Sequence, residues 1–236
     1  MEASLSRLFS MQHSPIIIAL DLETTEEARS VVRRLGSTAC FYKVGLELYA
    51  AAGMDFVREL KQQGYRVFLD LKLYDIGETV RRSVAQIAKA GADFLTIHAM
   101  RPVMAAAVDG KGTSPLKLLG VTVLTSFDDH NLKEMGYALN ISDLVGLRVR
   151  HAVETGMDGI VCSALEVARV RAITGPNATL VTPGVRSPGA DADDQKRIAT
   201  PAQAMTNGAD YLVIGRQVTR ARDPREEMLK ILSEIA

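Results

Sequence analysis

The residues best suited to chemistry are charged residues that end short apolar segments. Positions 70, 72 and 75 hold an aspartate, a lysine and a second aspartate. Asp70 and Lys72 are two residues apart, so on a strand their side chains point to the same side, and Asp75 follows in the loop. Asp21 and Lys43 end two other apolar segments. Charged groups that meet in a cleft perturb one another's protonation, which suits acid–base chemistry.

The elements that must position these residues alternate along the whole chain. Short apolar segments predict strands, and longer amphipathic segments between them predict helices. The strands are apolar on both faces, which is typical of parallel strands covered by helices. Strands are expected over 16–20, 41–44, 66–70, 94–98, 118–124, 159–162, 179–182 and 211–214, and helices over 26–35, 45–63, 79–90, 103–108, 142–155, 164–173, 201–207 and 224–235.

About eight strand–helix units of roughly 30 residues each account for the length. An open doubly wound sheet and a closed barrel both fit this alternation, but eight units without a break in composition favour a (β/α)8 TIM barrel of the α/β class. We expect a single domain over residues 14–236, preceded by an N-terminal extension over 1–13. In such a barrel the active site lies at the carboxyl ends of the strands.

The charged residues at those strand ends allow two interpretations. Charges beside a buried surface must be paired, so a purely structural ion-pair cluster is one of them. A barrel interior is normally filled by Val, Ile and Leu, however, and converging charges are costly to desolvate. The set Lys43, Asp70, Lys72 and Asp75 therefore favours an active site at one barrel mouth.

The last two strands indicate an anion site. The seventh strand is followed by a segment rich in Gly and Pro, residues 183–197, which predicts a mobile lid. The eighth strand is followed by Gly215 and Arg216 and then a helical stretch. Barrels commonly bind phosphate after this strand, where backbone N–H groups and a guanidinium supply the donors.

Composition excludes several classes of function. The 28 basic and 28 acidic residues cancel, and aromatic residues make up 5% of the chain, so nucleic-acid binding is not expected. No apolar run is long enough for a membrane span, and we expect a cytoplasmic protein.

Cys40 and Cys162 fit no zinc spacing and are expected to be small buried hydrophobes. No metal-ligand spacing, Walker motif or GxSxG motif is present, and His98 is expected to be structural.

A series of short motifs resembles one known family. In order along residues 15–225, the chain reads ALD, KVG, FLDLKLYDI, VTVLTS, DGIVCSA, LVTPGVR, DDQKRIATP and VIGR. This series is similar to the bacterial orotidine 5′-monophosphate decarboxylase family. The Asp-X-Lys-X-X-Asp core alone is less specific, because sugar-phosphate decarboxylases of the same superfamily share it.

The resemblance implies conversion of orotidine 5′-monophosphate to uridine 5′-monophosphate and carbon dioxide, the last step of de novo pyrimidine synthesis. It also implies a homodimer that needs no cofactor and no metal. Lys72 matches the proton donor to the C6 carbanion, and Lys43, Asp70 and Asp75 match the charged array, with Asp75 entering the partner subunit's site. The matched substrate-binding residues are Asp21 on the ribose, Lys43, Ile76, Thr79, Thr125 near the pyrimidine, Pro183, Arg186 in the lid, and Gln195, Gly215 and Arg216 on the phosphate.

Two segments depart from the family pattern and leave alternatives open. Gly77 and Glu78 stand where the family commonly has Pro-Asn or Pro-Thr, and Met100-Arg101-Pro102 replaces a small Gly-rich segment. One alternative is a Mg²⁺-dependent 3-keto-L-gulonate-6-phosphate decarboxylase-like enzyme, which the turn at Gly77 favours slightly. The other is a non-catalytic barrel that binds a phosphate ligand, although binding alone does not require a positioned ammonium group.

Overall fold

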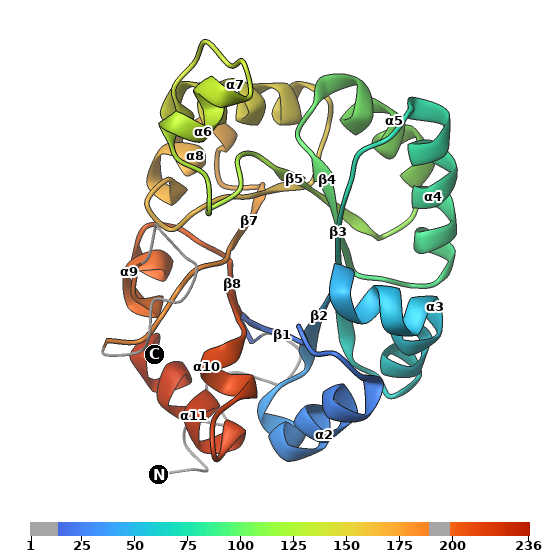
Figure 1. The fold of residues 1–236 in the computed structure, drawn as a ribbon, viewed down its shortest axis with the longest axis vertical. Helices are drawn as coiled ribbons and strands as arrows, with labels where there is room; N and C mark the ends of the chain where they lie inside the picture. The colour runs from blue at the N-terminus through green and yellow to red at the C-terminus, as the bar shows by residue number, and fades with distance from the viewer. Residues whose placement is uncertain (1–13, 189–198) are drawn as a thin grey trace.

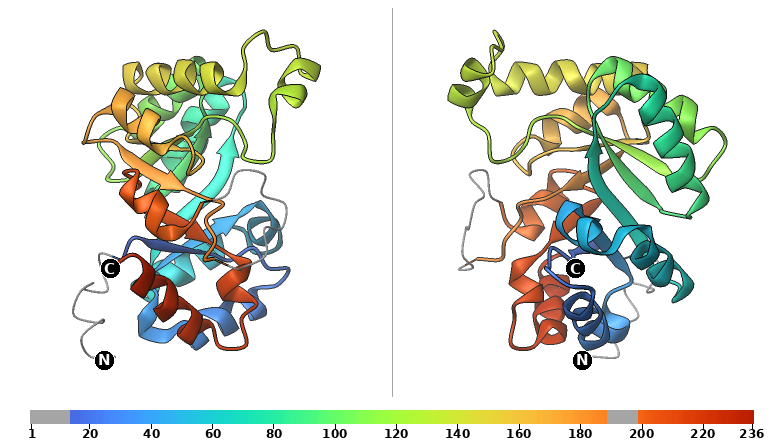
Figure 2. Two further views of the ribbon diagram at one scale, coloured as in Figure 1. Left: turned by 90° about the vertical axis from the view of Figure 1, so that its left-hand side faces the viewer. Right: turned by 45° about the vertical axis from the view of Figure 1, so that its right-hand side comes forward.

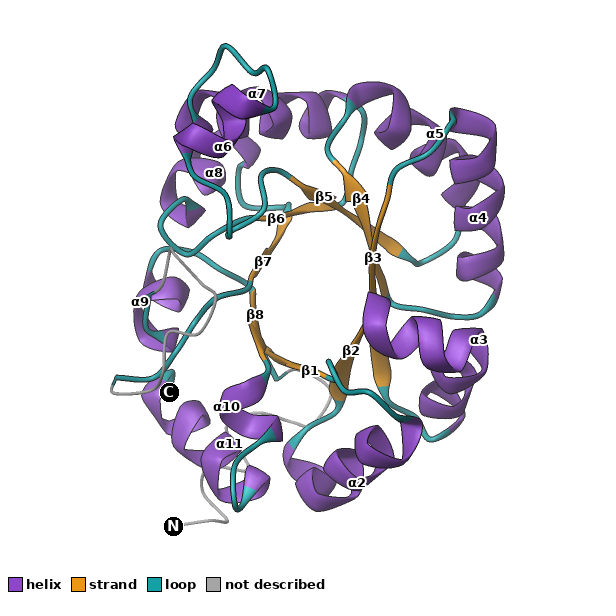
Figure 3. Cartoon of the chain, viewed as in Figure 1, coloured by secondary structure: helices purple, strands orange, loops and turns teal. Residues whose placement is uncertain are grey.

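A computed structural model describes residues 14–188 and 199–236 of the chain. Its centre is a closed barrel of eight parallel strands, each paired with its neighbours in chain order, and β8 closes the ring on β1. Figure 1 shows the strands as an inner ring, and Figure 3 shows the helices forming an outer ring around them. The strands are β1 (Ile16–Ala19), β2 (Phe41–Gly45), β3 (Arg66–Leu73), β4 (Phe94–His98), β5 (Lys117–Val121), β6 (Gly159–Val161), β7 (Thr179–Thr182) and β8 (Tyr211–Ile214). The predicted (β/α)8 barrel is confirmed.

The helices follow the strands in the expected order. They are α2 (Thr25–Leu35), α3 (Leu46–Gln62), α4 (Gly77–Lys89), α5 (Arg101–Lys111), α6 (Asp129–Glu134), α7 (Ile141–Glu154), α8 (Val167–Thr174), α9 (Pro201–Thr206), α10 (Arg216–Thr219) and α11 (Pro224–Glu234), with a 3-10 turn η2 (Gly36–Thr38). The short helix α6 was not predicted, and Figure 2 shows its segment standing away from the barrel. Within the described residues, no helix is both long and apolar enough to cross a membrane.

Two apolar layers hold the barrel together, and they follow the alternation of each strand. On β1, Ile16 and Ile18 pack outward against the helices, while Ile17 and Ala19 point into the barrel. The inward-facing set is Ile17, Ala19, Phe41, Phe68, Phe94, Leu119, Val181 and Val213. Side chains therefore fill the barrel interior, so a functional site can lie only at the ends of the barrel.

The amino-terminal end of the barrel is closed by an aromatic cluster around Arg66. The Arg66 guanidinium lies 4.0 Å from the centre of the Phe41 ring and donates two long hydrogen bonds to the Tyr211 hydroxyl. Phe94 packs edge-on against both of these rings. All four residues begin their strands, so this end is sealed by stacking and cation–π contacts.

The predicted strand over 118–124 is wrong at its carboxyl end, because β5 stops at Val121. Val123 and Leu124 are apolar for another reason, since both line cavities at this end of the barrel. Conversely, β3 continues to Leu73, three residues beyond the predicted end at Asp70. The carboxyl ends of β3 and β5 therefore differ from regular strands just where the cavity begins.

Candidate active site

A cavity of about 460 Å³ opens at the carboxyl end of the barrel. Ala19, Phe68 and Val213 form part of its floor, so it rests on the apolar filling of the barrel. The predicted site residues that line it are Asp21, Lys43, Asp70, Lys72, Thr125, Pro183, Arg186, Gly215 and Arg216. They come from the carboxyl ends of six of the eight strands or from the segments that follow them, because these ends meet at one mouth of the closed barrel.

Asp70 lies at the centre of the charged groups in this cavity. Its Oδ1 accepts hydrogen bonds from Lys72 Nζ at 2.9 Å and from Thr96 Oγ1 at 2.9 Å, and its Oδ2 lies 3.6 Å from Lys43 Nζ. Burial alone would raise the pKa of the Asp70 carboxyl, but Lys43, Lys72 and the hydrogen bonds outweigh burial and hold this pKa below its usual value. Asp70 is therefore a carboxylate at neutral pH.

Lys43 connects Asp70 to Asp21. Its Nζ donates to Asp21 Oδ1 at 2.7 Å, and its side chain is only 9% exposed, whereas that of Asp21 is 51% exposed. The charges therefore alternate in the order Asp21, Lys43, Asp70 and Lys72. Gly45 makes this arrangement possible, because a Cβ at that position would lie 2.6 Å from Asp21 Oδ1.

Lys72 reaches Asp70 through a break in the β3 ladder rather than along a regular strand. Leu69 pairs with Leu95 and Leu73 pairs with Ile97, so β3 advances four positions while β4 advances two. Lys72 has φ +48°, the only positive φ at a non-glycine position within 14–188 and 199–236. The bulge lifts the Lys72 side chain into the cavity.

A second set of groups in the cavity is cationic. Arg186 from the loop after β7 and Arg216 after β8 both line it, together with Gly215, which immediately precedes α10. Thr219 and Arg220, which no sequence motif marks, also line the cavity on this side. Guanidinium groups and backbone N–H groups suit an anionic group such as phosphate. Gln195 and most of the predicted lid lie outside the described residues.

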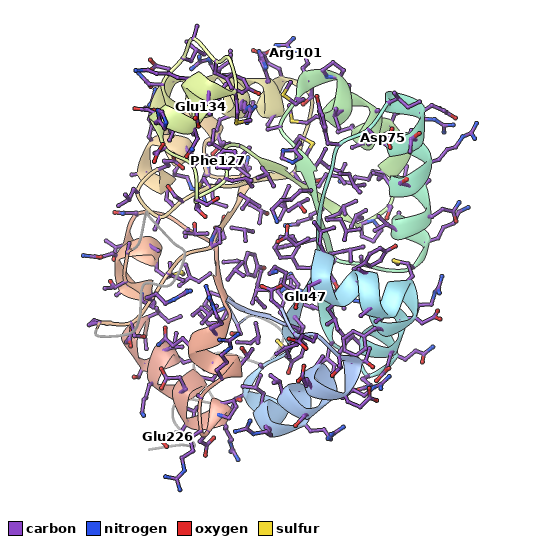
Figure 4. The ribbon with its side chains drawn as sticks, in the orientation of Figure 1. Glu47, Asp75, Arg101, Phe127, Glu134 and Glu226 are labelled. Carbon is purple, nitrogen blue, oxygen red and sulfur yellow. The ribbon has the colours of Figure 1, made fainter. Side chains whose placement is uncertain are left out.

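The predicted convergence of four charged residues at one mouth is wrong for Asp75. Asp75, Ile76 and Thr79 are exposed, and none of them lines the cavity of their own chain. Figure 4 labels Glu47 beside the barrel opening and Asp75 on the α4 side, away from it. The physical reason is local, since Asp75 Oδ1 accepts the Ile76 N–H at 2.6 Å and the chain then turns directly into α4.

The sequence of the chain is similar to the sequences of known proteins. The family described as Orotidine 5′-phosphate decarboxylase / HUMPS matches residues 14–231. The chain belongs to this family. It is similar to "Orotidine 5′-phosphate decarboxylase" of Caulobacter sp. (strain K31), with 52% identity over 221 residues that cover 94% of this chain and 96% of the relative. The protein of the same name from Methylobacterium nodulans is 50% identical over 224 residues, covering 94% of this chain and 95% of the relative.

The same relationship holds for solved structures. The crystal structure of orotidine 5′-phosphate decarboxylase from Lactobacillus acidophilus matches with a TM-score of 0.83 and 37% identity, covering 94% of this chain and 98% of that one. An uncharacterized conserved protein from Geobacillus kaustophilus matches with a TM-score of 0.81 and 35% identity, covering 94% of this chain and all of that one (100%).

The structure also shows the surroundings of His98 and of the two cysteines, which were predicted to be structural. His98 is half-buried beside a separate cavity of about 280 Å³, and the Tyr74 ring packs edge-on against it. Burial, Arg148 and Lys72 together lower the pKa of His98. Cys162 is buried as predicted, but Cys40 is only partly buried, and burial raises the pKa of its thiol.

Metal ligands can be considered only for the part of the chain that the structure describes. Within it, no three His, Cys, Asp or Glu side chains are grouped to hold a metal ion. In the cavity, the Asp70 carboxylate already has two ammonium partners, Lys72 at 2.9 Å and Lys43 at 3.6 Å, which balance its charge. The residues present therefore suit a charge-balanced organic site better than a Mg²⁺ site.

Proposed function

We propose that this chain converts orotidine 5′-monophosphate to uridine 5′-monophosphate and carbon dioxide, the last step of UMP synthesis. Membership in the family and the names of relatives that are about half identical support this activity. The observation that carries the proposal at the level of atoms is the ion pair between Lys72 Nζ and Asp70 Oδ1 inside the cavity. It presents one ammonium group to a reacting carbon in a pocket that also offers guanidinium groups.

The reaction needs charge stabilisation more than it needs a covalent intermediate. Cleavage of the bond between C6 and the carboxylate releases carbon dioxide and leaves the electron pair on C6, in the plane of the ring. That pair cannot delocalise into the π system, so the enzyme must stabilise it electrostatically. Lys72 places a positive charge against C6 and then transfers a proton from Nζ to it, and water returns the proton to the amine.

Asp70 and Lys43 support Lys72 in this step. Asp70 holds the ammonium at a fixed place by its 2.9 Å ion pair, and Lys43 balances the second oxygen of Asp70 at 3.6 Å. Because the array is pre-assembled, little reorganisation accompanies the development of charge.

The cationic side of the cavity binds the phosphate in this proposal. Arg186, Arg216 and Gly215 line the same cavity, and the resemblance to the family adds Gln195 to the phosphate-binding residues. Binding energy from a phosphate far from C6 can hold the ring against Lys72 and lower the barrier. Asp21, Thr125 and Pro183 contact the rest of the nucleotide, with Asp21 on the ribose hydroxyls.

The site is completed by a second copy of the chain. Asp75, Ile76 and Thr79 are exposed and lie outside the cavity of their own chain, which supports a role in the partner subunit's site. The active form is then a homodimer with shared sites. A cytoplasmic location is a further expectation of this proposal.

One assay tests the activity and separates the alternatives. The ultraviolet change on decarboxylation of orotidine 5′-monophosphate is followed with and without EDTA, using the wild type and Lys72→Ala. We expect EDTA-resistant turnover and a loss of at least about 10³-fold in Lys72→Ala, because the proton donor is removed. Activity abolished by EDTA would favour the magnesium-dependent alternative, and binding without turnover would favour a non-catalytic phosphate-binding barrel.

A further inference from the structure

The hydroxyl of Thr96 connects the two residues at the centre of the site. Thr96 lies on β4 and is fully buried, with 0% of its surface exposed. Its Oγ1 donates to Asp70 Oδ1 at 2.9 Å and accepts the backbone N–H of Lys72 at 2.9 Å. One hydroxyl thus contacts the side chain of the carboxylate and the main chain of the ammonium-bearing residue, which also contact each other at 2.9 Å.

The β3 backbone needs such a contact at Lys72. The ladder between β3 and β4 shifts register between Leu69 and Leu73, so the Lys72 N–H has no regular partner on β4. Lys72 also adopts φ +48°, a conformation that non-glycine residues rarely adopt unless their surroundings fix it. A buried N–H without a partner is unfavourable, and the Thr96 hydroxyl satisfies it.

Threonine is well suited to this position. Its branched Cβ restricts χ1, so the hydroxyl is held in one direction. In the segment Phe94–His98, Phe94 points into the barrel, and the alternation of a strand then turns Thr96 into the barrel two residues nearer the site. Leu95 and Ile97, between them, pack outward.

We propose that Thr96 is a positioning residue, whose hydroxyl fixes the bulge of β3 so that Lys72 and Asp70 face the reacting carbon in the correct geometry. The inference rests on the proposed decarboxylase function. Thr96 does not line the cavity, so it acts through Lys72 and Asp70 and not by contact with the nucleotide. Its loss should therefore change the chemical step and leave substrate binding nearly intact.

The test compares Thr96→Val, which keeps the shape but loses the hydroxyl, with Thr96→Ser, which keeps the hydroxyl. Thr182→Val is the matched control, because Thr182 is also a fully buried strand threonine, and its Oγ1 has no hydrogen-bond partner. We expect kcat to fall roughly 100-fold in Thr96→Val with KM for orotidine 5′-monophosphate almost unchanged, since small misplacements of catalytic groups have effects of this size. Thr96→Ser should recover most of the loss, and Thr182→Val should retain wild-type kcat.

Each possible result of these measurements supports or contradicts one specific proposal. A kcat for Thr96→Val equal to that of Thr182→Val would overturn the positioning role, and so would an equal loss in Thr96→Ser and Thr96→Val. If Thr96→Val fails to fold, wild-type kcat in Thr96→Ser with its expected fold supports the role, and a large loss of kcat there overturns it. A wild type that does not turn over orotidine 5′-monophosphate would instead contradict the proposed function itself.

Discussion

Asp70 is the residue on which the charged array depends, and its ionisation couples the site to stability. Its pKa is lower in the folded protein than the usual value, because Lys43, Lys72 and hydrogen bonds outweigh its burial. A carboxyl group with a lowered pKa stabilises the fold above its unfolded pKa, and this contribution is lost as the pH falls through the folded value. Protonation of Asp70 thus weakens the fold and disables the site together.

Asp70→Asn is therefore expected to lower the free energy of unfolding by roughly 2 kcal/mol at neutral pH, since it leaves the buried ammonium of Lys43 and the partly exposed ammonium of Lys72 without their shared anion. The difference from the wild type should shrink as the pH falls through the lowered pKa of Asp70, because Asp70 in the wild type then also becomes neutral. Urea unfolding of both proteins across this range measures it. A difference that stays constant or grows on acidification would contradict the lowered pKa.

Gly45 is a second single residue on which the array depends. Its φ is −91°, so glycine is not required for backbone conformation but for space. A Cβ there would lie 2.6 Å from Asp21 Oδ1 and 3.0 Å from Lys43 Nζ. An added methyl group would therefore displace Asp21 from Lys43.

Gly45→Ala is expected to reduce kcat/KM about tenfold or more, through displacement of Asp21 and Lys43, which we propose contact the substrate. Gly120→Ala is the matched control, because the nearest atoms to a Cβ there lie at 3.6 Å, an ordinary contact distance. Steady-state kinetics on both variants measure the effect. Equal values for the two variants would show that the Asp21–Lys43 pair can shift without consequence.

At the scale of elements, the strand–helix alternation was predictable from the sequence because each strand is a short apolar segment with clear ends. The structure gives β4, β7 and β8 the predicted bounds of 94–98, 179–182 and 211–214. The carboxyl ends of β3 and β5 were not predictable, because the bulge at Lys72 depends on pairing with β4, and Val123 and Leu124 are apolar for the cavities they line.

Some residues of the candidate site could likewise be predicted from the sequence, and others could not. Asp21, Lys43 and Asp70 come together because strand ends meet in any closed barrel, which local spacing is enough to predict. Lys72 joins them through the bulge of β3 and not through regular strand alternation. The direction of a loop depends on contacts that sequence spacing does not contain, so spacing alone wrongly places Asp75 at the mouth of its own chain. Thr96 was missed because a lone threonine in an apolar strand carries no charge to mark it, although its alternation with Phe94 was a usable signal.

A recurring Gly-X-Asp motif anchors three strands at the opposite end of the barrel. Each motif aspartate lies immediately before a strand, and its carboxylate accepts a backbone N–H from the preceding strand. The pairs are Asp93 with Val67, Asp158 with Leu118, and Asp210 with Leu180. Each aspartate also pairs with a cation from the helix that comes before that preceding strand, namely Lys61 of α3, Lys111 of α5 or Arg171 of α8. The motif thus connects two strands and a helix in each unit, far from the catalytic cavity.

Asp158→Asn is expected to lower the free energy of unfolding by about 2 kcal/mol, because it weakens the charge-assisted contacts to Lys111 and to the Leu118 N–H. The kcat of the folded protein should not change, since Asp158 does not line the cavity. Asp55→Asn is the control, because the Asp55 side chain is 92% exposed and such surface ion pairs contribute little. Urea unfolding with kinetics on the same samples distinguishes the two, and a large loss of kcat in Asp158→Asn would contradict this separation of roles.

The two ends of the barrel differ, because the amino-terminal end is sealed and the carboxyl-terminal end opens into the cavity. Aromatic rings and Arg66 close the amino-terminal end, whereas the carboxyl end carries the cavity and, beside it, exposed apolar side chains. Tyr74 and Ile76 are 66% and 73% exposed, and they flank Asp75 on both sides. Burial of these two side chains against a second chain would bring Asp75 into an interface, as the homodimer with shared sites requires.

Subunit mixing tests this arrangement of the whole assembly. Lys72→Ala and Asp75→Ala are each expected to be nearly inactive, but their joint refolding in equal amounts should restore about a quarter of wild-type activity, because half of the dimers then contain one complete site. Mixing Lys72→Ala with Asp70→Ala is the matched control. Asp70 and Lys72 contact each other within one chain at 2.9 Å, so no hybrid of those two variants contains a complete site and no activity should return. Equal recovery in both mixtures, or none in either, would contradict a site that takes Asp75 from the partner.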